Sequence, residues 1–135
     1  MRILVIEDSD SVRQMIETLV SARGHEVEAV PTGSKGIDSA VAHPPDAILL
    51  DLHLAGGFDG FAVCKKLREV EATRAVPIIV ISALTDEESK QRALDAGATA
   101  FYTKPFSPTA LLKELETIPL RESARMSARP PKPLP

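Results

Sequence analysis

Several short apolar runs in this chain end at a residue that could take part in chemistry. The run ILVI ends at Glu7 and Asp8, the run ILL at Asp51, the run PIIVI at Ser82, and the segment FYT at Lys104. Burying an apolar run gains about 25 cal/mol per Å² of area removed from water, and an unpaired charge at its end opposes that gain. These polar residues therefore need a reason beyond folding.

Three carboxylates and one ammonium group indicate phosphoryl chemistry with a metal ion. Carboxylates that lie close together repel, and one holds a proton at neutral pH unless a cation neutralises the group. Lys104 would offset one charge; a hard divalent ion such as Mg²⁺ offsets two and prefers oxygen ligands. A carboxylate at the end of a stiff strand can attack a phosphoryl group, because the lysine and the metal neutralise the phosphoryl oxygens. Asp51 is thus a candidate phosphoryl acceptor.

The apolar pattern predicts the elements that would position these residues. Strands are expected at 3–6, 25–30, 46–50, 76–82 and 100–103, and helices at 12–20, 33–43, 60–70, 86–97 and 107–118. Five alternating strand and helix units predict an α/β fold, a doubly wound five-stranded parallel sheet with five helices. Ligands bind outside the carboxyl ends of such strands, so the candidate residues should meet at one rim.

Length and composition favour one soluble domain. The 135 residues are 44% hydrophobic with a formal net charge of −3, which argues against a bare nucleic-acid-binding module. Cys64 is the single cysteine, so no internal disulfide forms, and its spacing is typical of a core residue. We read His25 and His43 as surface residues. No signal peptide or membrane span is evident, and cytoplasmic localisation is expected.

The last stretch of the chain differs from the rest. Residues 1–118 carry a formal charge of −6 and residues 119–135 one of +3, and the latter hold five of the eleven prolines. We expect residues 119–135 to form a disordered, basic, Pro-rich tail or linker outside a domain of residues 1–118. The low-complexity end favours a stand-alone protein slightly over a fragment of a longer one.

Four segments together resemble the receiver domain of two-component response regulators. These are ILVIEDS, AILLDLHL, PIIVISA and GATAFYTKPF, and the resemblance covers residues 1 to about 118. It implies a flavodoxin-like fold with strand order 2-1-3-4-5 and a magnesium cofactor. Asp51 would be the phosphoacceptor, and Glu7, Asp8 and Asp51, with the backbone carbonyl of His53, would hold the Mg²⁺.

The resemblance also assigns a switch. Ser82 and Lys104 would contact the phosphoryl group, Ser82 and Phe101 would form the switch pair, and the bond between Lys104 and Pro105 would be cis. Phe101 lacks the hydroxyl of a switch tyrosine, and Tyr102 should point to the other face of the sheet.

The loop after the acceptor departs from the family pattern. Ala55 stands where a proline is usual, and Gly60 comes nine residues after Asp51, so this Gly-rich loop is one residue longer.

The resemblance implies a phosphorylation-dependent signalling switch. A sensor histidine kinase or a phosphotransfer protein would phosphorylate Asp51, and the surface of 86–97, 100–103 and 107–118 would then change to control a downstream protein or form a homodimer. Direct nucleic-acid binding, membrane binding and enzymatic turnover beyond self-phosphorylation and slow self-dephosphorylation are not expected.

Other interpretations stay open. Taken singly, Glu7 and Asp8 could cap a helix, Ser82 could cap a turn, and Lys104 could be a surface lysine. A Mg²⁺-dependent phosphatase with an aspartyl-phosphate intermediate is an alternative function, although His53 stands where such an enzyme needs an acid. A receiver-like binding module that is never phosphorylated is another.

Overall fold

Strands and helices alternate along the whole described chain. The computed structural model describes residues 1–54, 59–83 and 86–118. The elements are β1 (Arg2–Ile6), α1 (Asp10–Ser21), β2 (Glu26–Val30), α2 (Gly33–Ala42), β3 (Ala47–Asp51), α3 (Gly60–Glu69), β4 (Ile78–Ser82), α4 (Glu87–Asp95), β5 (Ala100–Thr103) and α5 (Pro108–Glu116). The ten predicted elements are confirmed, with ends that differ by a few residues.

Each helix begins at a polar side chain that accepts a hydrogen bond from a backbone N–H of its first turn. The N-cap residues are Ser9, Thr32, Asp59, Asp86 and Ser107. Such caps satisfy donors that have no partner inside the helix. They fix where each helix starts after its strand, and so where each strand-end residue can lie.

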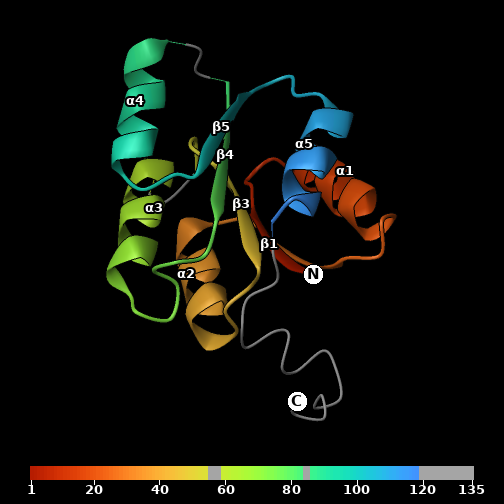
Figure 1. Ribbon diagram of the computed structural model, residues 1–135, viewed down its shortest axis with the longest axis horizontal. Coiled ribbons are helices and arrows are strands. Elements are labelled where there is room, and N and C mark those ends of the chain that lie inside the picture. The colour runs from red at the N-terminus through yellow and green to blue at the C-terminus, as the bar shows by residue number, and fades with distance from the viewer. Residues whose placement is uncertain (55–58, 84–85, 119–135) are drawn as a thin grey trace, which may run out of the picture.

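The five strands form one parallel sheet in the order β2-β1-β3-β4-β5. Helices α1 and α5 cover one face, and α2, α3 and α4 cover the other (Figure 1). Strands β3 and β4 lie inside the sheet and are buried along their whole length, whereas the edge strand β2 is mostly half-buried. The predicted doubly wound sheet and its strand order are confirmed.

Two apolar clusters, one on each face of the sheet, form the core. Leu50, Val80 and Leu67 belong to the cluster under α2, α3 and α4, and Leu49 and Ile81 to the one under α1 and α5. Side chains of a strand alternate between faces, so each central strand feeds both clusters. This packing holds the ends of β3 and β4 in place.

The predictions for three side chains away from the rim have different outcomes. Cys64 is buried in the core and His43 is exposed, as predicted. The surface reading of His25 is wrong, because its side chain is only 13% exposed and its Nδ1 lies 3.3 Å from the amino nitrogen of Met1. The imidazole also lies near Glu116 at the end of α5. Contacts with the amino end at Met1 and with Glu116 bury the imidazole of His25.

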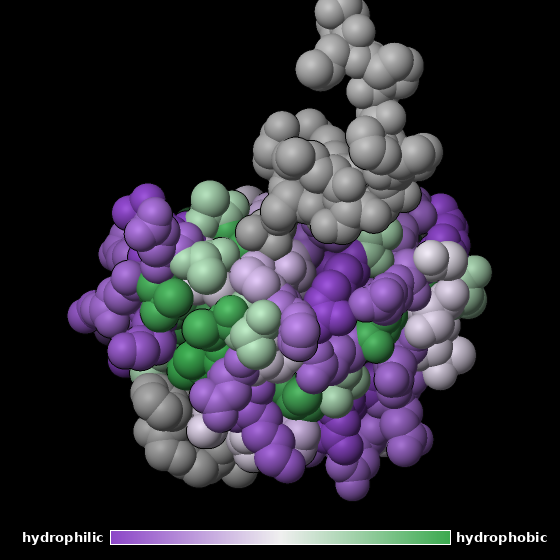
Figure 2. All heavy atoms as spheres, turned by 90° about the horizontal axis from the view of Figure 1, so that it is seen from below, coloured by the Kyte–Doolittle hydropathy of each residue, from purple (hydrophilic) through white to green (hydrophobic). Residues whose placement is uncertain are grey.

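Figure 2 shows the end of the molecule where the strands begin, opposite the rim where they end, and hydrophobic areas there are interrupted by hydrophilic ones.

Within the described ranges, no helix combines the length and the apolar character needed to cross a bilayer. The predicted tail at 119–135 and the departure at Ala55 lie outside the described residues.

Candidate functional site

Three carboxylates meet at the carboxyl ends of β1 and β3. Glu7 and Asp51 are 2% and 4% exposed, whereas Asp8 is exposed. One oxygen from each of these residues lies within 4.8 Å of the others. All three donors are anionic oxygens, which is the ligand set that Mg²⁺ prefers, and the exposed Asp8 leaves room for the waters it keeps. The cluster fits a magnesium ion.

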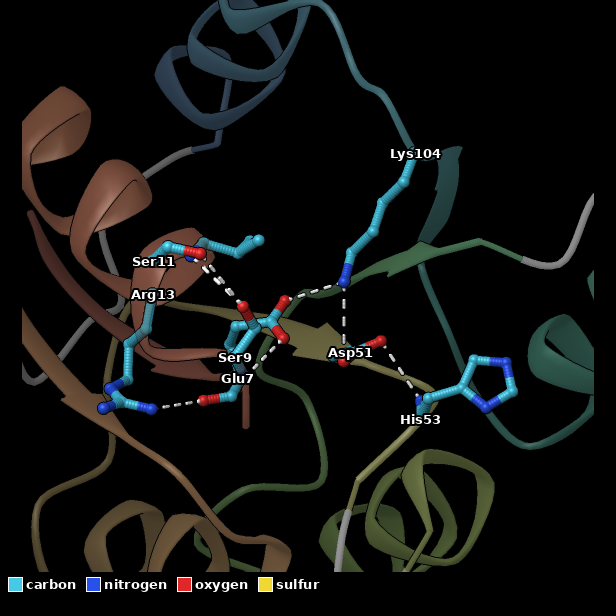
Figure 3. Close-up of polar contacts among 8 residues, drawn as sticks. Glu7, Ser9, Ser11, Arg13, Asp51, His53 and Lys104 are labelled. Carbon is cyan, nitrogen blue, oxygen red and sulfur yellow. Dashed lines mark hydrogen bonds and ion pairs between the residues drawn. The ribbon is translucent and has the colours of Figure 1, made fainter.

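Lys104 bridges two of these carboxylates from the end of β5. Its Nζ lies 3.0 Å from Oε1 of Glu7 and 3.5 Å from Oδ2 of Asp51, and the side chain reaches between them in Figure 3. The Lys104–Pro105 bond is cis, as the resemblance implies, and the Lys104 N–H donates to the carbonyl of Ser82 at 2.7 Å. The lysine thus brings one positive charge to the acidic cluster.

The pKa values of Glu7 and Lys104 are both raised, for different reasons. Burial raises the pKa of Glu7; the hydrogen bond from Lys104 opposes this, and the neighbouring Asp51 adds to it. Burial works to lower the pKa of Lys104, but its hydrogen bond to Glu7 and the charges of both carboxylates outweigh burial and raise that pKa. Lys104 is therefore held in its charged form, which is the form that binds a phosphoryl oxygen.

Asp51 is fixed by backbone groups on two sides. Its Oδ1 accepts a hydrogen bond from the His53 N–H at 3.1 Å, and in Figure 3 the His53 ring points away from the carboxylate. Gly60, the first residue of α3, donates its N–H to the carbonyl of Leu52 at 3.0 Å. A Cβ at position 60 would lie 2.6 Å from the carbonyl oxygen of Asp51, so the helix start packs directly on the strand end.

The two expected switch residues lie on neighbouring strands. Ser82 ends β4 and is fully buried, and Phe101 of β5 packs against the cluster under α2, α3 and α4. Tyr102 packs against the opposite cluster and donates its hydroxyl to Oε1 of Glu114 at 2.7 Å. Tyr102 therefore lies on the other face from Phe101, as the alternation of a strand predicts.

Sequence analysis missed one residue beside the cluster. Arg13 lies in the first part of α1 and donates from Nη1 to the backbone carbonyl of Glu7 at 2.9 Å. Its other nitrogen, Nη2, pairs with Asp10. A cation near the amino end of a helix is unfavourable to the helix dipole, and this local conflict in the segment EDSDSVR was the available signal.

Comparison with known proteins gives consistent matches. A family model described as the response regulator receiver domain matches residues 3–116. The chain is 34% identical to the DNA-binding dual master transcriptional regulator RpaA of Synechocystis over 125 residues, which are 93% of this chain and 51% of RpaA. It also matches Response regulator PleD of Caulobacter vibrioides, at 33% identity over 87% of this chain and 26% of PleD. The chain thus spans about half or less of these curated relatives.

Solved structures share the fold over nearly their whole length. Chemotaxis response regulator CheY4 of Vibrio cholerae superposes with a TM-score of 0.81 at 31% identity, over 87% of this chain and 98% of that chain. The receiver domain of a sensor histidine kinase from Pseudomonas aeruginosa has a TM-score of 0.80 at 31% identity, over 87% of this chain and 95% of that chain. That structure has a magnesium ion coordinated in its active site cleft.

Proposed function

Because this chain belongs to the response regulator receiver domain family, we propose that it is a phosphorylation-dependent signalling switch with Asp51 as the phosphoacceptor. One observation carries the proposal. The buried carboxylate of Asp51 lies 3.5 Å from the Lys104 ammonium and next to two further carboxylates at the rim. Two negative groups beside a phosphoryl acceptor are useful only if a cation balances them.

The proposed donor is a phosphohistidine on a sensor histidine kinase or a phosphotransfer protein. An oxygen of the Asp51 carboxylate forms the new bond to phosphorus while the bond from phosphorus to the donor nitrogen breaks. The electron pair of that bond stays on the imidazole, which leaves as the neutral ring because its other nitrogen already carries a proton. The strand end and the His53 N–H hold the Asp51 carboxylate in one orientation, which lowers the entropy cost of the attack.

The carboxylates of Glu7, Asp8 and Asp51, with the backbone carbonyl of His53, are the proposed ligands of a magnesium ion. When bound, Mg²⁺ supplies positive charge to the phosphoryl oxygens. Lys104 supplies a second charge, since a small movement of its Nζ from Glu7 reaches a phosphoryl group on Asp51. We propose no turnover beyond self-phosphorylation and slow self-dephosphorylation.

The response is proposed to pass from the rim to the surface of α4, β5 and α5. The Ser82 hydroxyl turns toward the phosphoryl group, and Phe101 packs into the space that Ser82 leaves. Phe101 is half-buried and lies on the α4 side of the sheet, so it can move either way at low cost. A shifted equilibrium between two arrangements of this surface would control a downstream protein or a second copy of the chain.

Phosphorylation of the purified protein with acetyl phosphate and Mg²⁺ tests the acceptor. Intact mass should show one added phosphoryl group on the wild type and none on Asp51→Asn. The matched control is Asp59→Asn, because Asp59 is an exposed aspartate that caps α3 and asparagine caps equally well. Labelling of Asp51→Asn, or its loss in Asp59→Asn as well, would contradict the proposal.

Ser82→Ala tests the switch separately from the acceptor. The variant should still be phosphorylated, because the serine is not the nucleophile. Amide chemical shifts of α4 and β5 should respond less to phosphorylation than in the wild type, since Ser82 no longer turns. A response of wild-type size at both elements would remove Ser82 from the switch.

A further inference from the structure

We infer that Arg13 is a positioning residue for the proposed magnesium site and acts through the peptide that joins Glu7 to Asp8. The inference rests on the proposed function, because it names a residue that prepares the site for the ion. Arg13 contributes no ligand to the cluster; its guanidinium reaches the backbone instead. In Figure 3 it approaches Glu7 from the side opposite to Lys104.

Hydrogen bonds hold the backbone of Glu7 at both its N–H and its carbonyl. The Glu7 N–H donates to the carbonyl of Val30 on β2 at 3.1 Å, and the Glu7 carbonyl accepts from Arg13 at 2.9 Å. The side chain of Glu7 is held as well, by the Ser9 N–H at 3.1 Å and by Lys104. Asp8 comes next and is exposed. The orientation of its carboxylate therefore depends on the peptide whose carbonyl Arg13 fixes.

The geometry favours a structural task for this arginine over a general charge effect. Its side chain is only 18% exposed, and its fork makes one bond to the Glu7 carbonyl and one to Asp10. A partly buried guanidinium that donates to two separate acceptors loses little freedom for each hydrogen bond it forms. Groups that orient metal ligands in this way typically change metal affinity by about 10- to 100-fold when they are removed.

Charge and geometry predict opposite effects of removing Arg13. The guanidinium is a cation near the acidic cluster, so by Coulomb's law its loss would tighten the binding of Mg²⁺. If Arg13 positions the peptide, its loss weakens binding because Asp8 is no longer held toward the ion. The sign of the change in affinity therefore distinguishes the two effects without any assumption about their size.

A Mg²⁺ titration of the full chain, followed by amide chemical shifts, measures the affinity directly. Arg13→Gln should bind Mg²⁺ about tenfold more weakly than the wild type. Arg13→Lys keeps the charge and can donate one hydrogen bond. Its Mg²⁺ affinity should therefore lie between those of the wild type and Arg13→Gln. Arg23→Gln is the matched control: it also removes one arginine of the α1 region, but Arg23 pairs with Glu116 at the other end of the helix. Its affinity should stay within about twofold of the wild type.

Asp10→Asn tests whether Arg13 acts only as half of a helix ion pair. It removes the partner but leaves the bond from Arg13 to the Glu7 carbonyl, so the affinity should fall much less than in Arg13→Gln. Equal losses in the two variants would contradict the inference, as would an unchanged or tighter affinity of Arg13→Gln. If Arg13→Gln does not fold in a thermal melt, Arg13→Met takes its place, because it keeps an unbranched side chain and removes the donors. An unchanged or tighter Mg²⁺ affinity of Arg13→Met then contradicts the inference.

The two proposals fail in different ways. If the wild type binds Mg²⁺ and Asp51 is phosphorylated, but Arg13→Gln binds as the wild type does, only the role of Arg13 is wrong. If the wild type shows no Mg²⁺ binding, or labelling survives Asp51→Asn, the proposed function fails together with the inference.

Discussion

Replacing Gly60 by alanine tests whether the backbone beneath Asp51 sets the position of the proposed phosphoacceptor. A Cβ at this position would lie 2.4 Å from the Cα of Leu52 and 2.6 Å from the carbonyl oxygen of Asp51. Carbon atoms in contact lie about 3.5 Å apart, so the start of α3 and the end of β3 must separate by about 1 Å. The two nearest atoms belong to the backbone, so a shift of the third, Cδ2 of the Leu52 side chain at 2.9 Å, would not relieve the clash.

Two effects of roughly known size follow. Overpacking of a tight site costs about 1–3 kcal/mol of unfolding free energy. A misplacement of about 1 Å can lower a rate by about 100-fold. Gly60→Ala should therefore lose stability and also phosphorylate Asp51 tens-fold more slowly with acetyl phosphate. The initial rate is followed by intact mass, and stability is followed by urea denaturation monitored by circular dichroism.

Gly36→Ala is the matched control. A Cβ at position 36 of α2 would lie 2.3 Å from Cδ1 of Ile6, so this variant is also overpacked, but against the end of a side chain and not against the backbone of Asp51. It should lose a similar free energy of unfolding and keep the phosphorylation rate within about threefold of the wild type. If Gly60→Ala is destabilised yet phosphorylated at the wild-type rate, helix α3 yields instead of the strand end, and the reasoning is refuted.

Three further predictions concern titratable groups away from the rim. Burial and the hydrogen bond to Glu114 raise the pKa of Tyr102 to about 12. Since this is the one tyrosine of a chain without tryptophan, absorbance near 295 nm should report its ionisation. Glu114→Gln should lower this pKa. The stability that Tyr102 contributes is present below its unfolded pKa of about 10 and is lost as the pH rises toward 12; ionisation near pH 10 in the folded protein would contradict this. Burial raises the pKa of Cys64 to about 11, so a thiol reagent at neutral pH should label it only in denaturant, and rapid native labelling would show the site is open. Burial and the Met1 amino group lower the pKa of His25. The contribution of His25 to stability is therefore present above about pH 6.5 and is lost as the pH falls. The difference in unfolding free energy between wild type and His25→Gln should shrink on acidification, and a constant difference would refute this prediction.

The fold could be predicted from local pattern because each element carries its own signals. Strand-length apolar runs, Ser107 followed by Pro108, and glycines at 24 and 97 specify where elements begin and end. Gly24 and Gly97 have φ values of 85° and 114°, which other residues adopt only at a cost. The order of five such units then leaves few topologies, because connections between parallel strands are right-handed.

The site could be predicted only as a set of residues at one rim. Chemical type and place at a strand end indicated Asp51, Ser82 and Lys104 from the sequence. Which carboxylate Lys104 contacts more closely was not accessible, since Glu7 at 3.0 Å and Asp51 at 3.5 Å differ by less than any pattern can resolve. The position of the Lys104 ammonium between the two carboxylates depends on how far β5 extends beside β4 and on where the Lys104 side chain leaves the strand.

The sequence by itself determined which side chains stand at the ends of the strands, because the alternation of apolar and helical segments is a local property. The tertiary structure decided what touches them: the guanidinium of Arg13 on the Glu7 carbonyl, the start of α3 against the Asp51 backbone, and the burial of His25. Each of these contacts needs two separate elements to lie within a fraction of an ångström of a given place. Packing of the whole sheet sets that placement, and no periodicity of residues encodes it.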